Sequence, residues 1–272
     1  MDKLKVRVIF VLAFIDMETP EKDNSEFADN VYKDMMDLFF NPEINRRKEQ
    51  KLLPENFTLL AAQAIFFPDG RPHIVRLNEE VSVEVKLKKG VNPTVKDFWA
   101  STYEVEHIKL NESEFLNCGH STLILFKDGY QLSFDFHYNK QLCYEHLTVA
   151  KEFLKTSKYA LDYDLGFAFI DTSFSTIELL AKTNLFLEAN QNIHGKTNHR
   201  TIKSAFNLRY KNSQSDFEIE RRRVFNHLSD ARTKARYLEG SINISKQELQ
   251  SIHDTVDKMY NELCDRARFN NS

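Results

Sequence analysis

The spacing of apolar residues changes near Tyr138, and this change constrains the fold more than any other feature of the 272-residue chain. Before it, apolar residues alternate with polar ones or form short runs, as in β-strands. After it, they recur every three or four residues, as in amphipathic helices. We therefore predict an α+β protein with two domains, a mostly antiparallel α+β domain over residues 1–143 and an all-α helical bundle over residues 144–272.

The first half contains clear strand and turn signals. Residues 81–87 alternate strictly between apolar and polar, which predicts a half-buried strand. Residues 121–126 and 131–138 flank Lys127-Asp128-Gly129, and Asp-Gly tolerates the positive φ of a tight turn, so we expect a β-hairpin there. Residues 26–40 have apolar side chains at helical spacing, whereas the charged run 46–51 is expected to be a surface connection. Nothing in this half predicts a catalytic constellation or a partner.

The second half predicts about five helices. The longest apolar segment, 165–187, is apolar on nearly all sides, so it is expected to be central to a bundle or buried at a subunit interface. Ser215 with Glu218, and Ser245 with Glu248, fit the capping box at the start of two later helices, and Thr197 is expected to cap a short basic helix. The predicted helices are 144–159, 165–187, 197–210, 216–238 and 246–266.

Charge is distributed unevenly along the chain. The formal net charge is -3, yet residues 194–236 contain 11 Lys and Arg against 4 Asp and Glu. Such a local excess can attract a polyanion, although solvated helix faces often look the same. The RNA-binding candidates within it are Lys196, Arg200, Lys203, Arg232 and Arg236.

Cysteine usage and hydropathy bear on location. The three cysteines are widely and irregularly spaced, so no disulfide framework is expected. The apolar run near the N-terminus, residues 8–15, lacks a small-residue cleavage site and is expected to be a buried strand. No apolar run reaches the roughly 18–20 residues that span a bilayer. We expect a cytoplasmic protein with no membrane partner.

Two segments of the second half resemble HEPN (higher eukaryotes and prokaryotes nucleotide-binding) domains. Phe174-Ser-Thr-Ile-Glu-Leu-Leu-Ala-Lys182 is similar to the central helix of that family, in which a Glu and a Lys lie near the dimer interface. His227-Leu-Ser-Asp-Ala-Arg-Thr-Lys-Ala-Arg-Tyr237, followed by the helix after Ser245, resembles the closing helices of the family. The resemblance covers about residues 145–266.

The resemblance implies a helical bundle that forms a homodimer and engages RNA or a nucleotide. Active members cut RNA without a metal or other cofactor, using an Arg and a His with four residues between them, paired across the dimer cleft. Arg222 and His227 match that spacing; His227 would move a proton while Arg222 holds the phosphate. Arg223 is a plausible substitute, because it shares a helix face with His227. Glu178 and Lys182 would lie at the interface, or simply form an ion pair.

Alternatives remain open. The domain could bind RNA or nucleotides without catalysis, or it could be a structural dimerisation protein whose charges only solvate it. The three consecutive arginines at 221–223 follow three acidic residues and could be intrahelical ion pairs. Gly195-Lys196-Thr197 lacks the rest of a phosphate loop. His137, Cys143 and His146 lack a second ligand pair at zinc-finger spacing, so no metal is expected.

Overall fold

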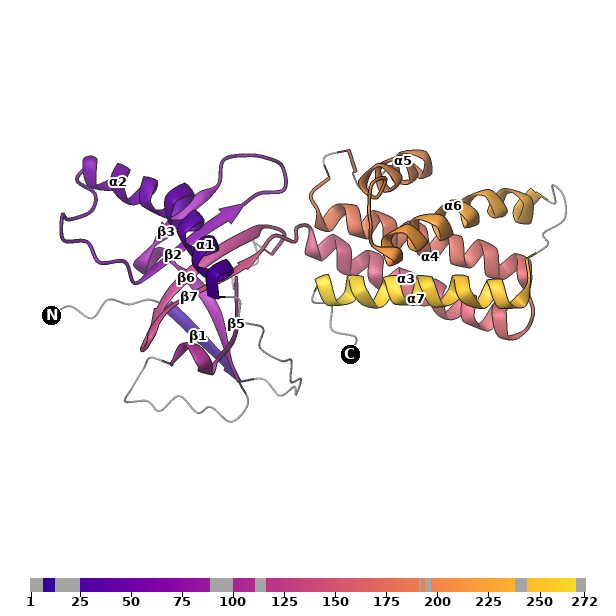
Figure 1. Ribbon diagram of the computed structural model, residues 1–272, viewed down its shortest axis with the longest axis horizontal. Coiled ribbons are helices and arrows are strands. Elements are labelled where there is room, and N and C mark those ends of the chain that lie inside the picture. The colour runs from indigo at the N-terminus through magenta and orange to yellow at the C-terminus, as the bar shows by residue number, and fades with distance from the viewer. Residues whose placement is uncertain are drawn as a thin grey trace. The chain divides into compact units, whose positions relative to one another are not determined.

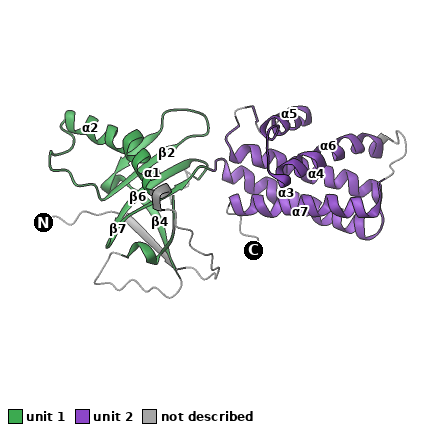
Figure 2. Ribbon diagram, viewed as in Figure 1, with its two compact units in different colours: residues 1–136 green, residues 137–272 purple. Residues whose placement is uncertain are grey.

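The computed structural model describes residues 7–12, 25–88, 100–110, 116–190, 192–193, 197–237 and 244–267. The chain divides into two compact units, residues 1–136 and 137–272 (Figure 2). The sequence-based boundary, between 143 and 144, lies a few residues further on, within the first helix of the second unit. The predicted α+β class is confirmed: strands belong to the first unit and long helices to the second (Figure 1).

The described strands of the first unit form two small sheets. One has the order β1-β4-β5, with β1 parallel to β4, and the other is antiparallel throughout, with the order β3-β2-β6-β7. The strands are β1 (Arg7–Leu12), β2 (Ala61–Phe66), β3 (Ile74–Leu77), β4 (Ser82–Leu87), β5 (Val105–Leu110), β6 (Gly119–Phe126) and β7 (Gly129–Asp135).

Both strand predictions with a specific signal are confirmed. β6 and β7 pair antiparallel as a hairpin, and Gly129 has a φ of 153°, which a residue with a Cβ rarely adopts. β4 buries Val83, Val85 and Leu87, while the residues between them are only partly buried. The buried valines pack in the core between the two sheets, together with Ile108 and Ile124 from β5 and β6.

The helical part of the first unit differs from the expectation in one respect. The predicted helix is present as α1 (Ser25–Met35) with a π-helical turn (Met36–Phe40), but a second helix, α2 (Asn41–Glu49), takes in most of the run expected to be a connection. This expectation was wrong because Arg46 and Arg47 pair with Glu43 one turn earlier, which supports a helix without an apolar stripe. Phe40 packs beneath the antiparallel sheet.

The described residues of the second unit form a bundle of five helices, as predicted. Figure 1 shows α3, α4, α6 and α7 running side by side, with the shorter α5 against α4 and α6. Most of α4 is buried inside this bundle, so the apolarity of this segment is explained within one chain. The helices are α3 (Lys140–Asp162), α4 (Gly166–Leu187), α5 (His199–Arg209), α6 (Asp216–Tyr237) and α7 (Lys246–Ala267).

The helix starts lie close to the predicted positions, but their capping groups differ in detail. At α7, the Ser245 hydroxyl accepts a hydrogen bond from the Glu248 amide, as expected. At α6, the Ser213 hydroxyl contacts the Glu218 carboxylate and accepts from the Ser215 amide. At α5, the cap is Asn198 rather than Thr197, because the Asn198 side chain accepts from the amide three residues on.

The described helices also bear on membrane insertion. None combines the length and the apolar character that crossing a bilayer would require.

Candidate anion-binding groove

The residues predicted to be catalytic lie on α6 but face different neighbours. Arg222 is directed toward α5, where its Nε donates to Asn207 Oδ1 at 3.1 Å. The His227 Nε2 atom lies 3.9 Å from a carboxylate oxygen of Glu248 on α7, and it has no hydrogen-bond partner among the described residues. Five positions along a helix turn a side chain by about 140°, which accounts for the separation. The fold of one chain therefore does not bring Arg222 and His227 together.

Arg223, the substitute considered for Arg222, forms an ion pair within its own helix. Its Nε and Nη2 atoms each donate to the Glu220 carboxylate at 2.8 Å. This pairing lowers the pKa of Glu220 and raises that of Arg223. The charge of Arg223 is thus largely compensated, and its side chain is half exposed.

The predicted RNA-binding residues divide into two groups. Arg232 and Arg236 both donate to the carboxylate of Asp171 on α4, at 3.1 and 2.6 Å, and the hydrogen bond from Arg236 is the main cause of a lowered pKa at Asp171. Arg200 and Lys203 instead lie on α5 and line a groove with Arg222. Lys196 lies outside the described residues.

Glu178 and Lys182, the two charged residues predicted to lie at a dimer interface, have different surroundings on α4. Glu178 pairs with His199 of α5. Lys182 is buried, and its ammonium lies 5.6 Å from the centre of the Phe186 ring. Burial lowers the pKa of Lys182, and the negative charge of Glu178 partly opposes that shift. Both residues thus have roles inside the bundle.

A groove with a strongly basic lining lies between α5 and α6. It has a volume of about 410 Å³, and none of its lining residues is acidic. Four of the seven carry a positive charge, and Leu208, 74% exposed, supplies an apolar edge. We call it the basic groove; its lining residues are Arg200, Lys203, Ser204, Asn207, Leu208, Lys211 and Arg222.

The basic groove differs from the rest of the unit in how its charges are compensated. Of the described arginines in the helical unit, only Arg200 and Arg222 have no carboxylate partner. Lys203 donates to Ser229 at 3.0 Å and to Asp230 at 3.2 Å, but the Asp230 side chain is 78% exposed and screens it weakly. Lys211 is exposed at the end of α5. The lining of this groove therefore contains three cations for which no carboxylate partner is found among the described residues, Arg200, Lys211 and Arg222.

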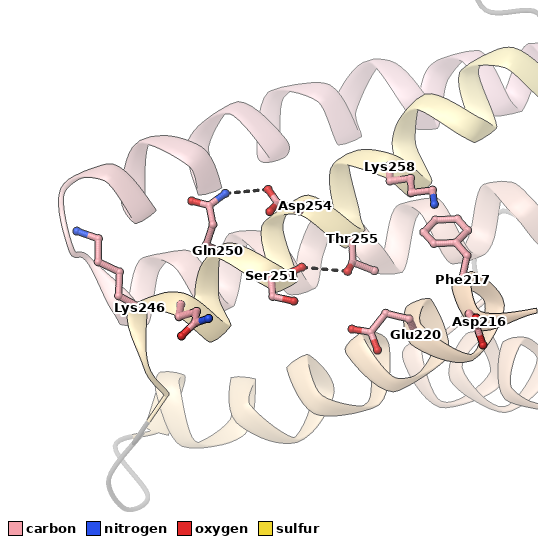
Figure 3. A pocket seen from close by; sticks show the side chains of 10 residues that line it. Asp216, Phe217, Glu220, Lys246, Gln250, Ser251, Asp254, Thr255 and Lys258 are labelled. Atoms are coloured by element: carbon pink, nitrogen blue, oxygen red, sulfur yellow. Dashed lines mark hydrogen bonds between the residues drawn. The ribbon is translucent and has the colours of Figure 1, made fainter.

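A second, larger groove lies between α6 and α7 (Figure 3). It has a volume of about 790 Å³ and a mixed lining that includes Asp216, Glu220 and Asp254. Its lysines are engaged: Lys258 lies 4.3 Å from the centre of the Phe217 ring, and Lys246 pairs with Asp164 at 2.7 Å. Because acidic groups outnumber basic ones, this groove is poorly suited to an anion.

Two features of the unit escaped the sequence analysis. Arg221, next to the arginines that were singled out, is 1% exposed and donates to Glu218 and Glu262 while packing on the Tyr210 ring. Asn207 was not singled out either, although residues 200, 203, 207 and 211 recur every three or four positions and so could have been placed on one helix face.

Comparison of the chain with protein-family models, with curated proteins and with solved structures finds no significant match. The fold and the groove define a two-unit α+β protein whose helical unit presents an uncompensated basic surface. Among the described residues, no group of three or more His, Cys, Asp and Glu side chains is placed to hold a metal.

Proposed function

We propose that the helical unit binds RNA through phosphate contacts in the basic groove. The observation that carries the proposal is the convergence of Arg200, Lys203, Lys211 and Arg222 on one surface whose lining has no acidic residue. Guanidinium and ammonium groups are the usual phosphate ligands, and they supply most of the affinity in sequence-independent binding. The resemblance of residues 145–266 to HEPN domains supports RNA as the polyanion, and a cytoplasmic location forms part of the proposal.

Binding without cleavage is the form of this function that the geometry of one chain supports. No histidine lines the basic groove, and His227 lies beside Glu248 on the other side of α6. A general base must come within hydrogen-bond reach of the proton it removes, about 2.6–3.2 Å. Cleavage through Arg222 and His227 would therefore need the two residues to come from different protomers of a homodimer.

The binding proposal is tested by fluorescence anisotropy with the full-length protein and a labelled 20-nucleotide single-stranded RNA. We expect affinity to fall steeply as KCl is raised from 50 to 200 mM. Binding of the protein releases counterions from the RNA phosphates, and this release becomes less favourable as the salt concentration rises. Reversing the charge with Arg200→Glu and Lys211→Glu should abolish binding. Lys155→Glu and Lys158→Glu on α3, outside the groove, form the matched control. Salt-independent binding, or equal loss in both double variants, would contradict the proposal.

Cleavage is distinguished from binding by incubating the protein with mixed cellular RNA in EDTA. The binding form of the proposal predicts intact RNA with wild type, Arg222→Ala and His227→Ala alike. Products formed by wild type alone would instead establish the acid-base pair in a dimer. A purely structural role predicts neither products nor any salt-dependent affinity.

A further inference from the structure

A pair of asparagines connects α5 to α6 next to the basic groove. The side-chain amides of Asn207 and Asn226 exchange hydrogen bonds, with Asn207 Nδ2 donating to Asn226 Oδ1 at 3.0 Å and Asn226 Nδ2 donating to Asn207 Oδ1 at 2.9 Å. Asn226 Nδ2 also donates to the backbone carbonyl of Arg222 at 3.0 Å. Both amide hydrogens of Asn226 are thereby used, and its orientation is fixed.

Arg222 completes this arrangement. Its Nε donates to Asn207 Oδ1 at 3.1 Å, so that oxygen accepts two hydrogen bonds and has no further lone pair to offer. Because the guanidinium is planar, fixing the Nε direction restricts the whole group. Nη1 makes one long contact of 3.5 Å with the Lys211 carbonyl, and Nη2 makes no hydrogen bond to any described residue. The outer edge of Arg222 is therefore available to the groove.

The chemical nature of the holding group matters as much as its geometry. The adjacent Arg223 is held by the Glu220 carboxylate, which occupies its Nε and Nη2 atoms and compensates its charge. Arg222 is held by an uncharged amide, so the guanidinium is oriented while its positive charge stays uncompensated. Such an edge suits bidentate contact with the two free oxygens of a phosphodiester.

We infer that Asn207 and Asn226 are positioning residues that present the outer edge of Arg222 as a phosphate subsite. The inference rests on the proposed RNA binding by the basic groove and adds to it a defined contact within an otherwise diffuse charged surface. Orienting a long side chain before the ligand arrives lowers the entropy lost on binding. The subsite would accept a backbone phosphate of single-stranded RNA whatever its sequence.

Two substitutions separate positioning from general stability. Asn207→Asp keeps the shape of the side chain and places a carboxylate on the Arg222 Nε atom, so RNA affinity should fall. It also replaces the donor that reaches Asn226 Oδ1, so a urea titration of this variant accompanies the binding assay and shows whether the fold is retained. Asn226→Ala removes the amide pair without changing the charge, and we expect affinity for the labelled 20-nucleotide RNA to fall roughly three- to tenfold. Asn261→Ala, which removes an exposed side chain bonded to Asp257 on α7, is the matched control.

Non-additivity supplies the decisive measurement. If Asn226 acts through Arg222, the double variant with Arg222→Ala should bind RNA no more weakly than Arg222→Ala alone. Independent, additive losses would overturn the inference, as would wild-type affinity in both asparagine variants. In the latter case Arg222→Ala would still weaken binding, and the proposed function would stand. If wild type itself showed no salt-dependent binding, the proposed function would fail, and the inference with it.

Discussion

Removing the Arg222 side chain should change the salt dependence of RNA binding by a calculable amount. Four cations line the basic groove, and the slope of log K against log salt for single strands is about -0.7 per phosphate contact, so wild type should have a slope of about -2.8. Affinity should then fall about 50-fold between 50 and 200 mM KCl. With three contacts left in Arg222→Ala, the slope should be about -2.1 and the fall about 20-fold.

The neighbouring arginine provides the control for this experiment. Arg223 is already paired with Glu220, so Arg223→Ala should leave the slope near the wild-type value. Anisotropy titrations at four or more KCl concentrations would resolve a slope difference of about 0.7. The reasoning is refuted if Arg222→Ala leaves the slope unchanged, or if Arg223→Ala reduces it as much.

The other predictions concern stability and reactivity. Arg221→Ala should lower the free energy of unfolding by about 3 kcal/mol, because it leaves a cavity where a fully buried side chain packs on the Tyr210 ring. Arg221→Met fills most of that space and should lose less; urea titration followed by circular dichroism measures both. Hydrogen bonding from Arg46 lowers the pKa of Glu43 from 4.5 to about 2. The ionised Glu43 carboxylate therefore stabilises the folded protein above pH 4.5, and this stabilisation is lost as the pH falls toward 2. The difference in unfolding free energy between wild type and Glu43→Gln should vanish over that range. Burial raises the pKa of Cys143 to about 12, so a disulfide reagent such as dithiobis(nitrobenzoate) should label this thiol at pH 8 only after denaturation.

Much of the fold could be predicted because the residue pattern within each strand, turn or helix favours the same structure that the tertiary fold requires. The alternation in β4 and the Asp-Gly turn before β7 each specify a strand or hairpin without reference to distant residues. The helices of the bundle follow from apolar residues at helical spacing, or, for α4, from a long segment that is apolar on nearly all sides. The parallel pairing of β1 with β4 could not be predicted in this way, because it joins residues about 75 positions apart, at Arg7 and Ser82, and depends on tertiary contacts.

The candidate site was only partly predictable, for a physical reason. Charge density indicated the segment that contains the groove, but sequence cannot show which cations have carboxylate partners on other helices. Asp171 is more than 60 positions from Arg236 and compensates it nonetheless. Arg221 and Arg222 are adjacent and of the same type, yet one is buried in an ion-pair network and the other lines the groove. Helix rotation, set by the apolar face of α6, decides between these two roles.

The position of α5 at the side of the bundle has a thermodynamic consequence. This short helix contributes Ile202 and Phe206 to the core, and Asn207 and Lys203 provide polar links from it to α6. A polyanion that contacts cations of α5 and Arg222 together would bridge the two helices. By linkage, such a ligand at 100 times its Kd would stabilise the helical unit by about 2.7 kcal/mol. Amide hydrogens of α5 would then exchange more slowly with solvent, whereas the exchange rates in the first unit would not change.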